Sequence, residues 1–269
     1  MARDGRGDFA DRYGPWAVVA GGSEGIGAAY ADDLGRRGCN LVLLANDAAS
    51  LDDIAPRLQR DHGVEVHTVL IDLAADDLVE VVEREVGDRE VGLLVYNAAA
   101  SAIGTFHETD PERLLAAVDV NVRGPVLLAR WIAPRLVARG RGGIILMASL
   151  AASQGSAMIA TYSATKAFNR VLAEGLWEEL GRAGVDVLAV TPGSTDTPTY
   201  RSSEPRGGPT LDAAEDVARA ALDGLGSGPV VVPGLRNRIT AVVAQRLLPR
   251  SVAIRTFSRV TRSMYGRRG

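Results

Sequence analysis

Disulfides, membrane spans and a surplus of charge of one sign are all missing from this sequence. The single cysteine, Cys39, has no partner in the chain, which excludes an intrachain disulfide and fits a reducing compartment. No apolar run approaches the roughly 18 to 20 residues needed to cross a bilayer. The formal net charge of -3 gives no overall attraction to nucleic acid. The first fifteen residues mix acids and arginines without an apolar stretch, unlike a secretory signal, so we expect a cytoplasmic protein.

Lysine is nearly absent as well. Of the thirty basic residues all but one are arginine, and the exception is Lys166. A planar guanidinium cannot imitate a compact ammonium with rotatable donors. The lysine therefore indicates that this position needs an ammonium in particular, not simply a positive charge.

Short runs rich in Val, Ile and Leu alternate with longer segments of helical spacing. Such runs are typical of strands buried on both faces, and the alternation predicts an α/β fold with a doubly wound, Rossmann-like parallel sheet. Ligands bind such sheets at the carboxyl ends of the strands. We expect one domain with a core at about 15–232 and a helical appendage at 236–269. The expected strands are 16–20, 40–44, 64–71, 92–96, 143–148, 185–190 and 229–232.

The first expected strand runs into a glycine-rich turn that opens a helix. Glycines at these places permit a tight turn and let the backbone approach a pyrophosphate, and the helix start supplies free N–H groups. This position in the chain favours a dinucleotide site over a merely structural turn. The residues of the turn are Gly21, Ser23, Glu24, Gly25, Ile26 and Gly27.

Tyr162 and Lys166 lie four residues apart in a helical segment and so share a face. An ammonium beside a phenol favours the phenolate, which predicts a Tyr162 pKa below its usual value of about 10. Ser149 ends the fifth expected strand, where its hydroxyl either holds a substrate oxygen or caps its own loop.

Three other polar residues follow or interrupt apolar segments. Asp72, next to Leu73, either accepts a hydrogen bond from an adenine amino group or caps the following helix. Asn97 and Asn121 are amides among apolar residues, and each either braces the backbone or orders a water.

Together these residues resemble the short-chain dehydrogenase/reductase family over about residues 15–232. Gly21, Gly25 and Gly27 match its Gly-x-x-x-Gly-x-Gly loop, and Asn97 matches its Asn-Asn-Ala-Gly segment. Its catalytic tetrad is matched by Asn121, Ser149, Tyr162 and Lys166, and its Pro-Gly segment beside the nicotinamide by Pro192, Gly193, Thr195 and Thr197.

The resemblance implies hydride transfer between a nicotinamide cofactor and a secondary alcohol or ketone. Ser149 would polarise the carbonyl, Tyr162 would move the proton, and Lys166 would lower the tyrosine pKa and hold the ribose. Asn121 would support a water that carries the proton outward. The family also implies a homodimer or homotetramer built on the helices that contain Asn121 and Tyr162. No metal site is expected.

The chain departs from the family pattern at Ala20, Gly22, Tyr96, Ala99 and, most informatively, after the second strand. NADP-using relatives place arginine at the position of Asn46, whereas this chain has Asn46, Asp47 and the nearby Glu24. Negative charge repels a 2′-phosphate, so NAD(H) is favoured over NADP(H), with Asp47 as a ribose partner. An arginine folding back from Arg36, Arg37 or Arg57 is the alternative.

The expected substrate pocket is mostly small and apolar, which suggests a hydrophobic substrate. By family position it draws on Ser101, Ile103, Ser156, Ala157, Met158, Ser194 and the segment 195–210.

The appendage has nine arginines and no acid. It reads as a solvated cover, as a subunit or substrate lid, or as a surface for anionic lipid or a phosphorylated substrate. Two rival functions also stay open: a non-catalytic dinucleotide-sensing regulator and a membrane-surface protein of the same fold.

Overall fold

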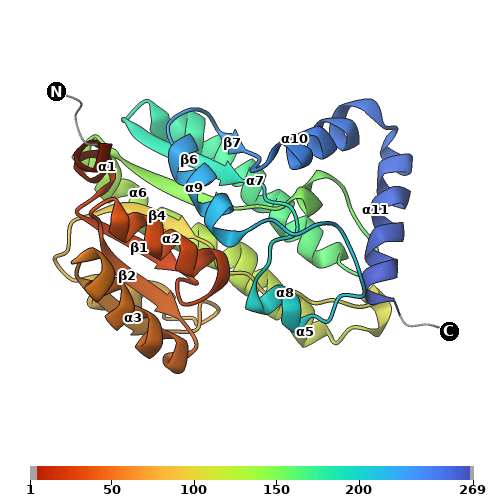
Figure 1. Cartoon of the computed structure of the whole chain (residues 1–269), viewed down its shortest axis with the longest axis horizontal. Helices are drawn as coiled ribbons and strands as arrows, with labels where there is room; N and C mark the ends of the chain where they lie inside the picture. The colour runs from red at the N-terminus through yellow and green to blue at the C-terminus, as the bar shows by residue number, and fades with distance from the viewer. Residues whose placement is uncertain (1–4, 267–269) are drawn as a thin grey trace.

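The computed structural model of the chain describes residues 5–266. All seven expected strands form within two residues of their predicted ends, and they build one parallel sheet in the order β3-β2-β1-β4-β5-β6-β7 (Figure 1). The predicted Rossmann-like architecture is confirmed. The strands are β1 (Trp16–Ala20), β2 (Asn40–Ala45), β3 (Val66–Leu70), β4 (Val91–Tyr96), β5 (Gly142–Met147), β6 (Val185–Val190) and β7 (Val230–Val231).

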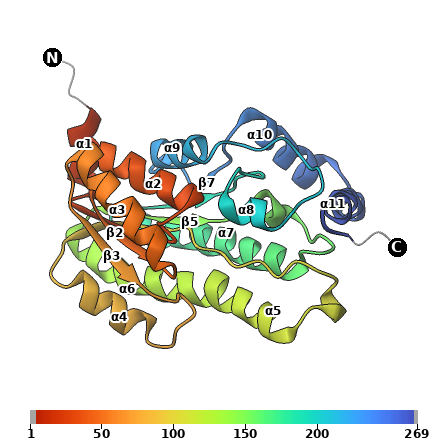
Figure 2. The ribbon, with the colours of Figure 1, turned by 60° about the horizontal axis from the view of Figure 1, so that its bottom comes forward.

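Both faces of the sheet are buried because alternate residues of each strand enter different cores. In β1, Ala17 and Val19 pack into one core, and Val18 and Ala20 pack into the other. This explains why the strands read as continuous apolar runs. One core is covered by α2 (Gly25–Arg36), α3 (Ala48–His62) and α9 (Ala214–Gly224), and the other by α4 (Leu78–Val86), α6 (Gly124–Arg139) and α7 (Ala160–Gly181) (Figure 2).

Several short elements were not predicted. Helix α1 (Gly5–Tyr13) precedes the sheet and buries Phe9 and Tyr13 in the α2 core. Helix α5 (Pro111–Val118) passes into α6 through a π-helical turn, η2 (Asp119–Arg123). The remaining short helices are η1 (Phe106–Glu108), η3 (Leu150–Ser153) and α8 (Pro198–Ser202).

The chain ends in helices, as expected: α10 (Leu235–Val242), a π-helical turn η4 (Val243–Leu247) and α11 (Arg250–Tyr265). The last predicted residues of this appendage, 267–269, lie outside the described part. Helix α11 is tied to the body because the hydroxyls of Thr261 and Ser156 are 3.0 Å apart and the Ala157 amide donates to Ser258 Oγ at 3.0 Å. Across residues 5–266, none of the helices is long and apolar enough to span a bilayer.

Candidate active site

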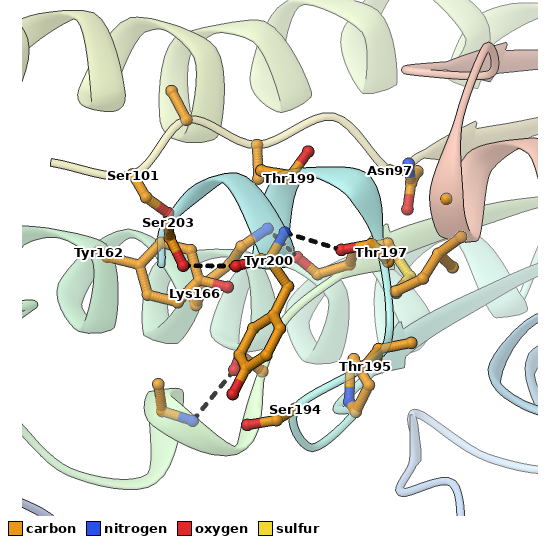
Figure 3. A pocket seen from close by; sticks show the side chains of 18 of the residues that line it. Asn97, Ser101, Tyr162, Lys166, Ser194, Thr195, Thr197, Thr199, Tyr200 and Ser203 are labelled. Atoms are coloured by element: carbon orange, nitrogen blue, oxygen red, sulfur yellow. Dashed lines mark hydrogen bonds between the residues drawn. The ribbon is translucent and has the colours of Figure 1, made fainter. Parts of the chain in front are cut away.

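A cavity of about 890 Å³ opens at the carboxyl edge of the sheet, beside the neighbouring strands β1 and β4, after which the chain crosses in opposite directions to β2 and β5. This is the place where ligands of doubly wound sheets bind. Sixteen of the predicted cofactor residues line it, and so does Ser149; Figure 3 shows several of the lining side chains. Gly27 and Asn121 do not line it; they contact the backbone of the lining residues Gly21 and Ala100. Ser101, Ile103, Ser156 and Ser194 also line the cavity, but the predicted Ala157 and Met158 do not.

The glycine turn is tightly packed, and its backbone has no room for side chains at Gly21 and Gly27. Gly21 has a φ of 75°, and a Cβ on it would come within 2.8 Å of the Ala98 Cα. A Cβ at Gly27 would overlap the Gly21 carbonyl oxygen. Asn97 Nδ2 donates to that same oxygen at 2.9 Å, so this amide braces the loop. Gly25 and Ile26, at the start of α2, line the cavity, and the N–H groups of a helix start are suited to bind a pyrophosphate.

Tyr162 and Lys166 lie on the same face of α7 and both line the cavity, as their spacing predicts. The Lys166 ammonium is 5.8 Å from the centre of the Tyr162 ring. It is buried and donates to the Met147 carbonyl at 3.0 Å. Two of its three donors remain for other partners.

The expected fall in the Tyr162 pKa is not found. Burial raises the pKa of the Tyr162 phenol, and the neighbouring Ser149 hydroxyl only partly offsets this. Burial also lowers the pKa of Lys166 to about 8. An ammonium beside a phenol favours the phenolate, but both groups lie in a low-dielectric site that disfavours their charged forms.

Ser149 follows β5 and its hydroxyl accepts a hydrogen bond from the Ala151 amide at 3.2 Å. The loop-capping role considered from the sequence is therefore real. The same hydroxyl lies in the cavity wall and interacts with Tyr162. A hydroxyl can accept from its loop and still donate to a substrate oxygen, so the two roles are compatible.

Asn121 braces the backbone. Its Oδ1 accepts from the Ala100 amide and its Nδ2 donates to the Ala100 carbonyl, both at 2.8 Å, with Thr165 Oγ1 3.1 Å from Nδ2. The side chain is fully buried and both of its amide hydrogens have partners, so the expected water cannot be held by this amide group's donors. Tyr96, a departure from the family pattern, donates to the Val120 carbonyl at 2.6 Å and supports the same π-helical turn.

The three acidic cofactor candidates have local partners. Asp47 caps α3 by accepting from the Ser50 amide at 3.3 Å and from the Ser50 hydroxyl, which lowers the pKa of Asp47. Asp72 accepts from the Ala74 amide at 2.9 Å; because α4 begins only at Leu78, this closes a turn and does not cap the helix. Glu24 accepts from Thr199 of α8 at 2.8 Å and joins the glycine turn to the segment that follows β6.

Part of the cavity wall comes from α8 and the segment that follows it, which lie within the predicted range 195–210, and from α11, which carries none of the family motifs. Tyr200 projects from α8 into the cavity (Figure 3). The Arg206 amide donates to the Met264 carbonyl at 3.0 Å, which joins the segment after α8 to the end of α11. This contact supports the lid alternative for the inner face of the appendage. The α11 residues in the wall are Thr256, Phe257, Val260, Thr261, Met264 and Tyr265.

Comparison with known proteins settles the family. Residues 15–206 match the short chain dehydrogenase family over most of the chain. The protein belongs to this family. As a short-chain dehydrogenase it is an NAD(P)-dependent oxidoreductase, which confirms the predicted enzyme class.

Its relatives include the 7beta-hydroxysteroid dehydrogenase of Clostridium sardiniense, 30% identical over 86% of this chain and 90% of the relative. The very-long-chain 3-oxoacyl-CoA reductase of Mus musculus is 30% identical over 88% and 74%. A solved structure of a 7beta-hydroxysteroid dehydrogenase superposes with a TM-score of 0.87 at 26% identity, covering 93% of this chain and 98% of the other. A short-chain dehydrogenase from Sphingobium yanoikuyae in complex with NADPH has a TM-score of 0.78 at 33% identity, covering 86% and 93%.

Proposed function

We propose that this dehydrogenase interconverts a bulky hydrophobic ketone and its secondary alcohol. The observation that carries the proposal is the wall of the cavity beyond Tyr162, which α11 builds from Phe257, Val260 and Met264. Apolar walls with a few polar groups are typical of sites that bind hydrophobic small molecules. The steroid and long-chain acyl relatives act on substrates of this kind.

In the reductive direction, a bound nicotinamide cofactor supplies the hydride to the carbonyl carbon. Ser149 donates a hydrogen bond to the carbonyl oxygen, and Tyr162 transfers its phenolic proton to that oxygen as negative charge develops. A raised Tyr162 pKa keeps this donor protonated at neutral pH. Lys166, with one donor on the Met147 carbonyl, would hold the ribose of the cofactor with its other donors, and Asn121 holds the loop at Ala100 in place.

The test is a substrate panel followed through the absorbance of the reduced nicotinamide. It contains polycyclic ketones, long-chain 3-oxoacyl thioesters and small ketones, each with both cofactors. We expect the highest kcat/KM for a bulky apolar ketone. A clear preference for small polar ketones would contradict the substrate proposal. Tight cofactor binding without any turnover would instead support a dinucleotide-sensing regulator.

We also propose that NAD(H) is the preferred cofactor. Glu24, Asp47 and Asp72 line the cavity near the glycine turn and the ends of β2 and β3. The arginines named above as alternative phosphate partners form ion pairs elsewhere: Arg36 and Arg37 with Asp33, at 2.9 and 3.0 Å, and Arg57 with Asp32 at 3.3 Å. A 2′-phosphate would therefore meet carboxylates, and the one arginine among the described lining residues, Arg236, donates to the Thr210 carbonyl and lies 3.4 Å from Asp212.

Combining Asn46→Arg with Glu24→Ser is expected to move the kcat/KM ratio toward NADP(H) by about one to two decades or more. A charge-assisted hydrogen bond to phosphate contributes about 1.5 to 3 kcal/mol, and removal of a like charge adds to it. The measurement is kcat/KM for both cofactors with one ketone. Asn46→Gln, which lengthens the side chain without charge, is the control and should leave the ratio unchanged. A wild-type enzyme that already prefers NADP(H) would refute the NAD(H) proposal.

For assembly, we propose a homodimer or homotetramer built on the helices that contain Asn121 and Tyr162, which are the segment α5-η2-α6 and α7. Their outer faces expose apolar side chains, among them Val126, Val137, Phe168, Val171 and Trp177. Burying such side chains against a second copy would remove them from water. The mass in solution, measured by light scattering, decides between monomer and oligomer.

We propose a cytoplasmic location, which the buried free thiol of Cys39 supports.

A further inference from the structure

The C-terminal helices expose both basic and apolar side chains. Between residues 235 and 266 the chain has seven arginines and neither Asp nor Glu. Figure 1 shows α10 and α11 together at the end of the molecule away from α1. We call the exposed Arg and apolar side chains of α10, η4 and α11 the C-terminal basic surface.

On α11 the arginines form a row. Arg255, Arg259 and Arg262 follow each other at spacings of four and three residues and are exposed, whereas Ala253 and Thr261 are buried. Among the described side chains, no carboxylate forms an ion pair with any of the three arginines. Like charges at these spacings repel one another and weaken a helix. The row therefore costs the isolated protein stability, and an anionic partner would offset that cost.

The apolar part of the surface is on α10 and η4. Leu235 and Ile239 have exposed fractions of 73% and 56%, and Leu247 has one of 69%. Leu235, Ile239 and Val242 recur at helical spacing, with Arg238 on the same side. Large apolar side chains interleaved with arginine do not suit a solvated cover alone.

We propose that the C-terminal basic surface docks on an anionic lipid bilayer. Arginines meet the phosphates of the headgroups while neighbouring apolar side chains enter the boundary with the acyl chains. A nucleic acid would use the arginines but leave Leu235, Ile239 and Leu247 in water. A second copy of this surface, related by a two-fold axis, would set the arginine rows against each other.

Docking also places the cavity beside the lipid. Val260 is next to Arg259, has an exposed fraction of 42% and lines the cavity. A hydrophobic ketone dissolved in the bilayer would therefore have a short path into the site. This link to substrate supply rests on the proposed function, whereas docking itself does not.

The test is co-sedimentation of the full chain with phosphatidylcholine vesicles that contain or lack phosphatidylglycerol. We expect binding to the anionic vesicles only. The triple variant Arg255→Gln, Arg259→Gln, Arg262→Gln should lose at least about tenfold in vesicle affinity, since each arginine near such a surface contributes to attraction. The matched control, Arg60→Gln, Arg84→Gln, Arg182→Gln, removes the same charge from exposed positions elsewhere and should bind like wild type.

Apolar insertion is tested with Ile239→Ser combined with Leu247→Ser. This variant should bind the vesicles more weakly than wild type, also at raised salt, where the attraction between arginines and headgroups is screened. Circular dichroism and turnover of a water-soluble ketone show that each variant is folded. Absence of binding to anionic vesicles, or equal losses in both arginine triples, would overturn the proposal. An affinity for vesicles that the apolar substitutions leave unchanged would also overturn it, as would a higher affinity for heparin than for vesicles. Both results would indicate a soluble polyanion as the partner. Because activity is measured separately, failure of docking leaves the proposed reaction intact.

Discussion

Tyr162→Phe is expected to lower kcat/KM by about 10² to 10⁴, the usual contribution of a general acid or base. The substitution removes only the phenolic oxygen and its proton, and the ring stays on α7 in the wall of the cavity. Cofactor binding should be almost unchanged, because Lys166 keeps its position through the Met147 carbonyl. Steady-state kinetics and fluorescence titration with the reduced cofactor separate the two effects.

The pH profile of wild type provides a second readout for the same residue. Reduction needs the protonated phenol, so its rate should stay level through neutral pH and fall only above the raised Tyr162 pKa. Oxidation needs the phenolate, so its rate should rise with pH through the neutral range and level off above the same pKa. In the Phe variant the residual rates should lose this opposite dependence. A variant that keeps most of the wild-type kcat/KM would remove Tyr162 from the mechanism.

The framework of the fold could be predicted because its signals are local. Buried parallel strands read as apolar runs, and the glycines of the first turn are required by backbone geometry at Gly21 and Gly27. The spacing of Tyr162 and Lys166 puts both side chains on one helix face independently of any tertiary contact. These features depend on neighbours within a few residues, which the chain order displays directly.

What could not be predicted depends on residues far apart in the chain. The partners of Asn121 are the backbone of Ala100, 21 positions earlier, and Thr165, 44 positions later. The closure of the cavity by α11 depends on contacts between the segments around Ser156 and Thr261. The Tyr162 pKa was predicted in the wrong direction because burial is a tertiary property. Met158, with a φ of 69° and its carbonyl accepting from the Gly104 amide at 2.9 Å, has no sequence signal at all.

Lys166→Arg should lower kcat/KM by at least about a hundredfold despite keeping the charge, since a misplacement of about 1 Å at a reacting site is enough for such a loss. Lys166 is only 2% exposed, and its ammonium fits between the Met147 carbonyl and the cavity. A forked guanidinium is larger and planar and cannot occupy that place. The matched control is Arg170→Lys on the same helix, where the side chain pairs with Glu174 at 2.9 Å near the surface. It should leave activity unchanged, so similar losses in both variants would point to damage of α7 as a whole.

Lys166→Met separates the charge from the shape and has a readout that does not depend on activity. Burial lowers the pKa of Lys166 to about 8 in the folded chain, so between this value and the unfolded pKa of about 10.4 the unfolded state binds more protons. The ammonium therefore costs stability at neutral pH, and the cost shrinks as pH rises through that window. Without cofactor, the Met variant should have a higher Tm than wild type at pH 7, with a difference that narrows toward alkaline pH, while turnover is lost. For Lys166→Met, a Tm difference independent of pH would show that Lys166 is not a buried cation. For Lys166→Arg, near-normal turnover would show that an ammonium is not required at this position.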